Sequence, residues 1–185
     1  MKQAFEQSNL ARDVQNFRCP RWAELPTIEL YMDQLTGYIN SVFGPLNSDG
    51  AESPLLTKAM VNNYVKQRVI ERPTNKKYGK SQLAQLIAIC ALKQVFSIPD
   101  ICVLLRVALE HDSVQHAYDY FCDELEGALA ASFGGGESLP PHSGTDPEQL
   151  SQLVRRAAQA WASKIYVQKR IEYLWQQREK GTPCS

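Results

Sequence analysis

The residues of this chain that could do chemistry gather between positions 57 and 80, where cationic side chains stand among amide side chains. The segment holds seven Lys and Arg residues and one Glu, a net charge of +6 that the remaining residues balance with −6. Lys and Arg neutralise phosphates, and Asn, Gln and Arg can read the edges of bases. This composition indicates a contact with nucleic acid. The candidate DNA-contacting residues are Lys58, Asn62, Asn63, Lys66, Gln67, Arg68, Arg72, Lys76, Lys77 and Lys80.

The first part of this segment is predicted to be a helix from Thr57 to about Arg68. Thr57 is a suitable N-cap, and apolar residues follow it at the spacing of an inward helical stripe. Lys58, Asn62 and Lys66 are spaced four residues apart, so they share one outward face. The helix would therefore have an apolar back and a cationic front, the division that a DNA-recognition helix requires.

The second part, residues 71–79, is predicted to be a tight loop or a short hairpin with a basic tip. Pro73 excludes a helix at this point, and the sequence ERPTNKKYG is typical of a turn. Lys76, Lys77 and Tyr78 could then reach the DNA backbone beside the helix, as a wing does. The alternative interpretation of the whole basic segment is a solvated surface, because charge runs often have no other role.

The sequence makes no comparable case for catalysis or for a bound metal. His111, His116 and His142 are the only histidines, and the first two are five residues apart, so they do not share a helical face. The five cysteines contain no CxxC pair, and the glycines at 134–136 lack the preceding strand of a phosphate-binding loop. We therefore expect a protein that is not an enzyme and that holds no cofactor or metal.

The elements around the basic segment are predicted to be helices. Apolar residues recur at steps of three and four over 27–43, 81–96, 97–109 and 113–132. The helix 81–96 is apolar over most of its surface, so it should be the central one. Ser97, with Asp100 three residues later, is typical of a capped helix start. The fold class is therefore all-α, mainly helical with a small β-hairpin wing.

Composition divides the chain into four regions. Residues 1–19 are polar and aperiodic and are predicted to be a flexible N-terminal tail. Residues 20–132 form the helical domain, which opens with an extended arm around Trp22. Residues 133–145 are rich in Gly, Ser and Pro and predict a linker. Residues 146–185 predict one long helix that packs on its own domain or on a partner.

The segment 110–126 contrasts with the basic segment, because it holds six Asp and Glu residues and no Lys or Arg. Such a segment could dock the basic segment of a second copy. Elsewhere, no apolar run approaches the roughly 20 residues of a membrane span, and the N-terminus has no secretory pattern. We therefore expect a cytoplasmic protein without a membrane contact.

Residues 56–105 resemble the winged helix-turn-helix of MerR-type regulators. In this resemblance Asn63 and Tyr64 occupy the aromatic end of the recognition helix, 69–73 match the turn that follows, Tyr78 closes the wing, and 97–101 begin a later helix. The chain departs from the pattern in three ways: a longer helix at 27–43, a shorter wing, and Asn63 in place of Arg. The resemblance implies a DNA-binding unit at about 57–109.

A second resemblance covers roughly residues 20–125. The segments PRWAELP, LTKAMVNNYV and KKY, followed by LIAICALKQVFSI, are together similar to a bacterial family of uncharacterised proteins, classed as a domain of unknown function. This likeness implies the fold rather than an activity.

Two functions follow as hypotheses. The first is a transcriptional regulator that binds duplex DNA as a homodimer, with 57–68 in the major groove and the last helix serving dimerisation or ligand sensing. The second is a non-catalytic protein–protein interaction adaptor built on a helix-turn-helix scaffold, whose basic segment docks an acidic partner.

Overall fold

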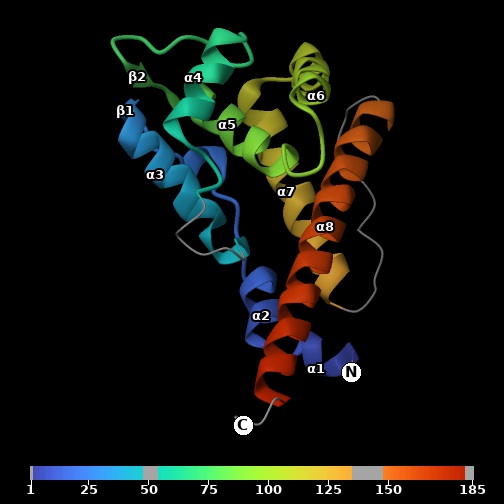
Figure 1. Cartoon of the computed structure of the whole chain (residues 1–185). Coiled ribbons are helices and arrows are strands. Elements are labelled where there is room, and N and C mark those ends of the chain that lie inside the picture. The colour runs from blue at the N-terminus through green and yellow to red at the C-terminus, as the bar shows by residue number, and fades with distance from the viewer. Residues whose placement is uncertain (1, 48–53, 135–147, 182–185) are drawn as a thin grey trace.

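The computed structural model describes residues 2–47, 54–134 and 148–181. They form a mainly helical fold with one small antiparallel sheet, as the predicted fold class states (Figure 1). The elements in chain order are α1 (Lys2–Glu6), α2 (Asn9–Gln15), the 3-10 turn η1 (Trp22–Glu24), β1 (Leu30–Tyr31), α3 (Met32–Phe43), the 3-10 turn η2 (Gly44–Leu46), α4 (Lys58–Lys66), β2 (Lys77–Tyr78), α5 (Lys80–Leu92), α6 (Ile98–His111), α7 (Val114–Phe133) and α8 (Glu148–Gly181).

Helix α5 is the centre of the core, as its apolar surface predicted. Every residue from Leu86 to Leu92 is buried, and α3, α6, α7 and α8 all contact this helix. A helix that is apolar all round is stable only when other elements cover it on every side. The arrangement of the other helices therefore follows from the need to cover α5 (Figure 1).

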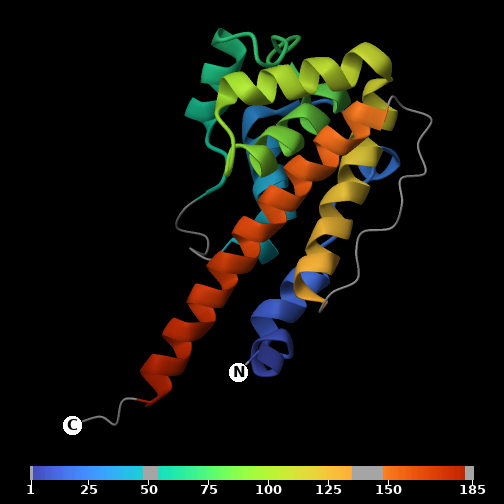
Figure 2. The same ribbon diagram turned by 90° about the vertical axis from the view of Figure 1, so that its right-hand side faces the viewer.

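The last helix, α8, packs on its own domain. It runs beside α7 in the same direction, from the end that carries α6 towards the end that carries α1 (Figures 1 and 2). Trp161, Ala162 and Ile165 on its inner side are buried. The salt bridge between Arg155 on α8 and Glu124 on α7, at 3.0 Å, joins the two helices beside this seam.

The prediction of a flexible tail over 1–19 is wrong. Lys2–Glu6 and Asn9–Gln15 form α1 and α2, and Ser8 caps α2 by accepting a hydrogen bond from the Ala11 amide at 3.3 Å. Phe5 is fully buried, with its ring 6.1 Å from Phe133 and 5.6 Å from Tyr166. Two short helices separated by a break show no long periodicity, so only their packing on α7 and α8 reveals them.

The helix predicted over 27–43 begins later, at Met32. Leu30 and Tyr31 instead form β1, which pairs antiparallel with β2. The Gln34 side chain accepts a hydrogen bond from the Tyr31 amide at 3.0 Å, which satisfies one free donor at the helix start.

The predicted linker 133–145 lies almost wholly outside the described residues, and α7 continues through Phe133.

The arm at residues 19–25 is bound to α7 by carboxylates of the acidic segment. Asp119 accepts a hydrogen bond from the Trp22 amide at 2.6 Å, and Glu126 accepts one from the Cys19 amide at 2.8 Å. Arg21 forms salt bridges with Asp123 and Glu126, both at 2.8 Å. The hydrogen bond to Glu126 raises the pKa of the Arg21 guanidinium further above its usual value. The acidic segment therefore serves in good part to hold this arm.

Two thiols lie under the same arm. The Sγ atoms of Cys19 and Cys122 are 3.1 Å apart and both residues are buried. The Tyr118 hydroxyl beside them donates a hydrogen bond to the Pro20 carbonyl at 2.7 Å. The hydrogen bond with Cys19 and burial raise the pKa of the Cys122 thiol, and burial raises the pKa of Tyr118. Cys122 and Tyr118 are therefore uncharged in the folded protein at neutral pH.

Candidate nucleic-acid interface

Helix α4 carries the outward face that the sequence predicted. The Thr57 hydroxyl accepts a hydrogen bond from the Met60 amide at 3.2 Å, which confirms the predicted N-cap. Val61 and Tyr64 are buried, whereas Lys58, Asn62 and Lys66 are exposed. Burial raises the pKa of Tyr64, so this anchor of the helix stays neutral.

The helix is shorter than predicted, because it ends at Lys66 and not at Arg68. Arg68 adopts a left-handed conformation with φ of 59°. The Arg68 amide donates to the Val65 carbonyl at 3.1 Å, and the Val69 amide donates to the Tyr64 carbonyl at 2.9 Å. These two bonds form a Schellman motif, in which the left-handed residue is usually Gly. An Arg in this position costs about 1 kcal/mol relative to Gly.

The chain then turns through a hairpin with a basic tip, as predicted. Thr74 and Lys77 exchange two backbone hydrogen bonds of 2.9 and 3.1 Å, and the two residues between them both have positive φ, 50° for Asn75 and 64° for Lys76. Positive φ at both central residues defines a type I′ turn, whose twist matches that of the flanking strands. The exposed Lys76 is therefore held at the tip.

The hairpin is anchored on a part of the chain that the sequence did not implicate. Its second strand, β2, pairs with β1, with Tyr31 opposite Lys77 and Leu30 opposite Tyr78. Tyr78 is buried under this sheet. The wing is therefore tied to the start of α3, so its position relative to α4 is determined by the core.

Two amide side chains that sequence analysis missed hold the interface in shape. Gln82 accepts a hydrogen bond from the Gly79 amide at 2.6 Å, and it donates to the carbonyls of Glu71 at 3.3 Å and Arg72 at 3.2 Å. Asn40 on α3 makes two hydrogen bonds with the backbone of Leu56, both at 2.9 Å. Gln82 stands three residues after Gly79, a capping spacing that could have revealed it.

The seven cations among the ten predicted contact residues fall into two groups. Three of the cations are engaged within the chain: Lys58 forms a salt bridge with Asp33, Lys77 lies 5.2 Å from the centre of the Tyr31 ring, and Lys80 lies 5.2 Å from that of the Trp22 ring. Four others are exposed and form no ion pair with any described residue. These four are Lys66, Arg68, Arg72 and Lys76.

The three amides of the set, Asn62, Asn63 and Gln67, are exposed on the same helix or at its end. The side-chain Nε2 of Gln67 donates a hydrogen bond to the Asn63 side-chain oxygen at 3.3 Å, so these two amides are oriented together. Helix α4 and the hairpin occupy the end of the molecule opposite α1, α2 and the end of α8 (Figures 1 and 2). Cations and amides thus stand together on a helix and hairpin at one end of the protein.

Other chemistry finds less support in the described part of the chain. No three His, Cys, Asp or Glu side chains in the described ranges gather closely enough to hold a metal ion. His116 lies on α7 and pairs with Asp112 four residues before it. Among the described helices, none has the length and apolar character to cross a membrane.

The fold and this site define a mainly helical protein that presents a cationic helix and hairpin at one end. A family model described as a domain of unknown function, DUF1836, matches residues 20–121. The match covers more than half of the chain, so the protein belongs to this family, and the predicted likeness to an uncharacterised family is confirmed. It includes the arm, α3 to α6 and the start of α7. No curated protein and no solved structure matches the chain.

Proposed function

We propose that this protein binds duplex DNA through α4 and the hairpin that follows it, in the manner of a winged helix-turn-helix regulator of the MerR type. The observation that carries the proposal is the group of four exposed cations, Lys66, Arg68, Arg72 and Lys76, without an ion-pair partner among the described residues. Cations left exposed on a helix and a projecting hairpin are suited to phosphates on either side of a groove.

The order of elements supports a helix in the major groove. The major groove, about 12 Å wide, admits one α-helix, and base edges there are read by Asn, Gln and Arg. Asn62 and Asn63 on α4 supply such groups, and Arg68 and Lys76 follow them along the chain. The hairpin would contact the adjacent backbone. The pairing of β2 with β1 ties the hairpin to the start of α3, which also contacts α4.

The conformation of Arg68 gives independent support. A Gly at this left-handed position would relieve strain and favour the folded state. An exposed Arg in a strained left-handed conformation is typical of a residue with a role in binding, since strain gathers at functional sites.

The experiment is a titration of a fluorescent 40-base-pair random-sequence duplex at two salt concentrations. The change is K66E with R72E, and the matched control is R12E with R156E, which alters the net charge equally on exposed residues of α2 and α8. Each lost phosphate contact lowers the salt slope by about 0.9, and two reversals should weaken binding by about 100-fold or more at low salt.

The control variant should bind the duplex as the unchanged protein does. Equal weakening in both variants would mean that only the net charge matters, and absence of a salt-dependent complex in the unchanged protein would refute the proposal. Both variants should unfold at nearly the same urea concentration as the unchanged protein, since exposed substitutions usually change stability by about 0.5 kcal/mol or less.

The predicted homodimer belongs to the same proposal. Val167, Ile171, Leu174 and Trp175 make a stripe along the last turns of α8, and each is 44–58% exposed. The spacing of three and four residues places them on one helical face. We assign this stripe to self-association, because the same apolar face on two copies can pair about a twofold axis.

Light scattering coupled to size exclusion tests this assignment. The variant I171E with W175E should be monomeric where the unchanged protein is dimeric, whereas Q176E with Q177E, which adds the same charges to exposed positions of the same helix, should remain dimeric. If the unchanged protein is monomeric at tens of micromolar, the proposed dimer is refuted. The proposal of DNA binding is not affected by that result.

The second candidate function is the interaction adaptor, and the exposed stripe on α8 favours it. In this case a protein would dock on Val167, Ile171 and Trp175 without DNA. The acidic segment is a poor partner for the basic segment of a second copy, because Asp119, Asp123 and Glu126 already bind the arm. Failure of the duplex titration in a protein that stays monomeric, with this stripe uncovered, would favour the adaptor.

A further inference from the structure

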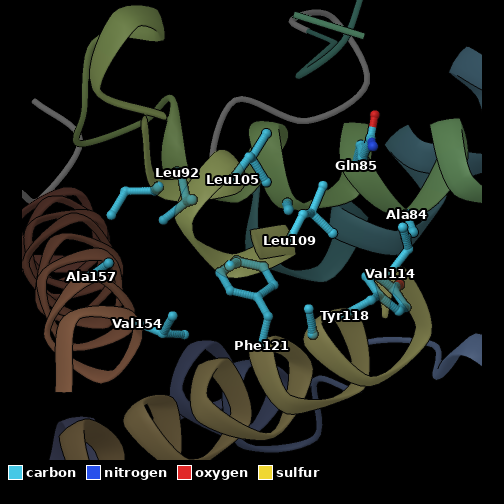
Figure 3. Close-up of a pocket in the computed structure, with 14 residues that line it drawn as sticks. Ala84, Gln85, Leu92, Leu105, Leu109, Val114, Tyr118, Phe121, Val154 and Ala157 are labelled. Atoms are coloured by element: carbon cyan, nitrogen blue, oxygen red, sulfur yellow. The ribbon is translucent and has the colours of Figure 1, made fainter. Parts of the chain in front are cut away.

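A cavity lies between four helices on the side of the core away from α3. Helices α5, α6, α7 and α8 surround a space of about 70 Å³, open at one side (Figure 3). In this view Leu105 and Leu109 descend from α6, Phe121 rises from α7, and Val154 and Ala157 close the side formed by α8. The cavity is thus set inside the helical body and is separate from the cationic interface.

Helix α6 covers the cavity incompletely. Among the residues of α6 whose burial is described, only Ile101 is fully buried, although Leu104, Leu105 and Ala108 also lie on the inner side and line the cavity. These three remain half-buried, and the cavity lies beneath them. An apolar lining without close packing loses dispersion contacts, and a molecule that filled the space would restore them.

The chemistry of the lining selects the class of molecule. Apart from Gln85 and Tyr118, every lining residue is Ala, Val, Leu or Phe. The Tyr118 hydroxyl is already bonded to the Pro20 carbonyl, so this residue offers only its ring. No charged side chain lines the cavity, so a charged molecule would enter without a partner at a large desolvation cost.

We propose that this cavity is a binding site for a small neutral apolar molecule, of about one carbocyclic ring or a short alkyl chain. Apolar cavities of this kind remain dry and take benzene-sized molecules; an engineered example has about 150 Å³. The space here is smaller and open at one side, so the opening gives the molecule a path in and its apolar part fills the space. The site is independent of the proposed DNA binding, and its test contains no DNA.

Toluene and benzoate serve as a matched pair of probes, because they share the ring and differ in charge at neutral pH. Calorimetry measures the affinity of each probe. The shifts of the methyl signals of Leu104, Leu105 and Val154 in NMR spectra show where the probe binds. Toluene should give saturable shifts at these methyl groups, whereas benzoate should bind at least tenfold more weakly. The absence of saturable shifts up to the solubility of toluene would overturn the proposal, as would equal binding of benzoate.

Two pairs of variants distinguish binding in the cavity from binding on the surface of the same helices. A117L fills the cavity from α7, and its control A130L adds the same side chain at an exposed position of α7. L105A enlarges the cavity from α6, and its control V103A shortens a residue of α6 that is 55% exposed.

Toluene affinity should fall at least tenfold in A117L, rise several-fold in L105A, and stay within twofold in both controls. Equal affinities in A117L and A130L would overturn the proposal, because they would place toluene elsewhere. If A117L fails to fold, the comparison of L105A with V103A still decides the test.

Discussion

The basic segment 57–80 and the acidic segment 110–126 each carry charges almost wholly of one sign, yet the structure uses them differently. Asp119, Asp123 and Glu126 bind the arm, and Glu124 binds Arg155 on α8. Four cations of the basic segment have no such partner in the described chain. The difference is that the acidic segment meets another part of its own chain, whereas the basic segment faces outward.

Exposure decides how much each pair contributes. The carboxylate of Glu124 is 8% exposed and its partner Arg155 is 23% exposed, whereas Lys58 and Asp33 are 62% and 74% exposed. Exposed pairs are worth about 0 to 1 kcal/mol, so the Lys58–Asp33 pair stabilises the fold little. Breaking a buried pair is more costly because a charge is left without a partner. Substitutions in the acidic segment should therefore change mainly the stability of the fold, whereas substitutions in the basic segment should change mainly duplex binding.

The largest expected effect on folding comes from E126A. This change removes the acceptor of the Cys19 amide and one of the two salt-bridge partners of Arg21, so the free energy of unfolding should fall by about 2 to 3 kcal/mol. Urea unfolding measures it. E126Q, which retains an acceptor, should lose less, and duplex affinity should be unchanged in both. An equal loss in the two variants would contradict the hydrogen-bond account.

As pH rises, the packing under the arm should lose stability at a lower pH than the basic segment is affected. Cys122 and Tyr118 have raised pKa values in the folded protein. The unfolded chain ionises these groups near pH 8.5 and 10, while the folded chain keeps the protons, so stability falls as pH rises through this range. Between pH 8 and 9.5 the loss should be about 1 to 2 kcal/mol.

Urea unfolding at a series of pH values checks this expectation. The fall should be shallower in C122A, whereas C102A, which changes a half-exposed thiol on α6, should retain the slope of the unchanged protein. A slope unaffected by C122A would mean that other groups cause the alkaline loss.

Q82A should have a smaller effect, confined to the hairpin. The variant removes the acceptor of the Gly79 amide and the donor to the Glu71 and Arg72 carbonyls, so we expect a loss of about 1 kcal/mol. Amide hydrogen exchange should become faster at Thr74 and Lys77 and stay the same on α7. S81A, at the exposed neighbouring position, is the control and should leave both exchange rates unchanged.

The smallest change in stability, and one of opposite sign, is expected for R68G. Glycine relieves the left-handed strain, so the free energy of unfolding should rise by about 0.5 to 1 kcal/mol, while loss of the guanidinium should weaken duplex binding several-fold. R68A loses the charge but keeps the strain, so it should weaken binding without gaining stability. If R68G bound duplex as well as the unchanged protein, Arg68 would have no role in the interface.

The sequence alone determined the local features of this protein. The caps at Thr57 and Ser97 are confirmed, because a capping hydrogen bond joins residues two or three apart and is present in a short window of sequence. The central position of α5 is likewise confirmed, since its apolar surface requires cover on every side. The basic hairpin tip at Asn75 and Lys76 follows from turn chemistry in the same way.

Only the tertiary structure decided which distant segments meet. The pairing of β1 with β2, the arm held by Glu126, and the burial of Phe5 join residues far apart in the chain. Two-residue strands and helices as short as α1 have almost no periodic pattern, and packing stabilises them more than local propensity does. For the same reason, the sequence showed two charged segments but not that Asp119, Asp123 and Glu126 would bind the arm while Lys66, Arg72 and Lys76 would stay exposed.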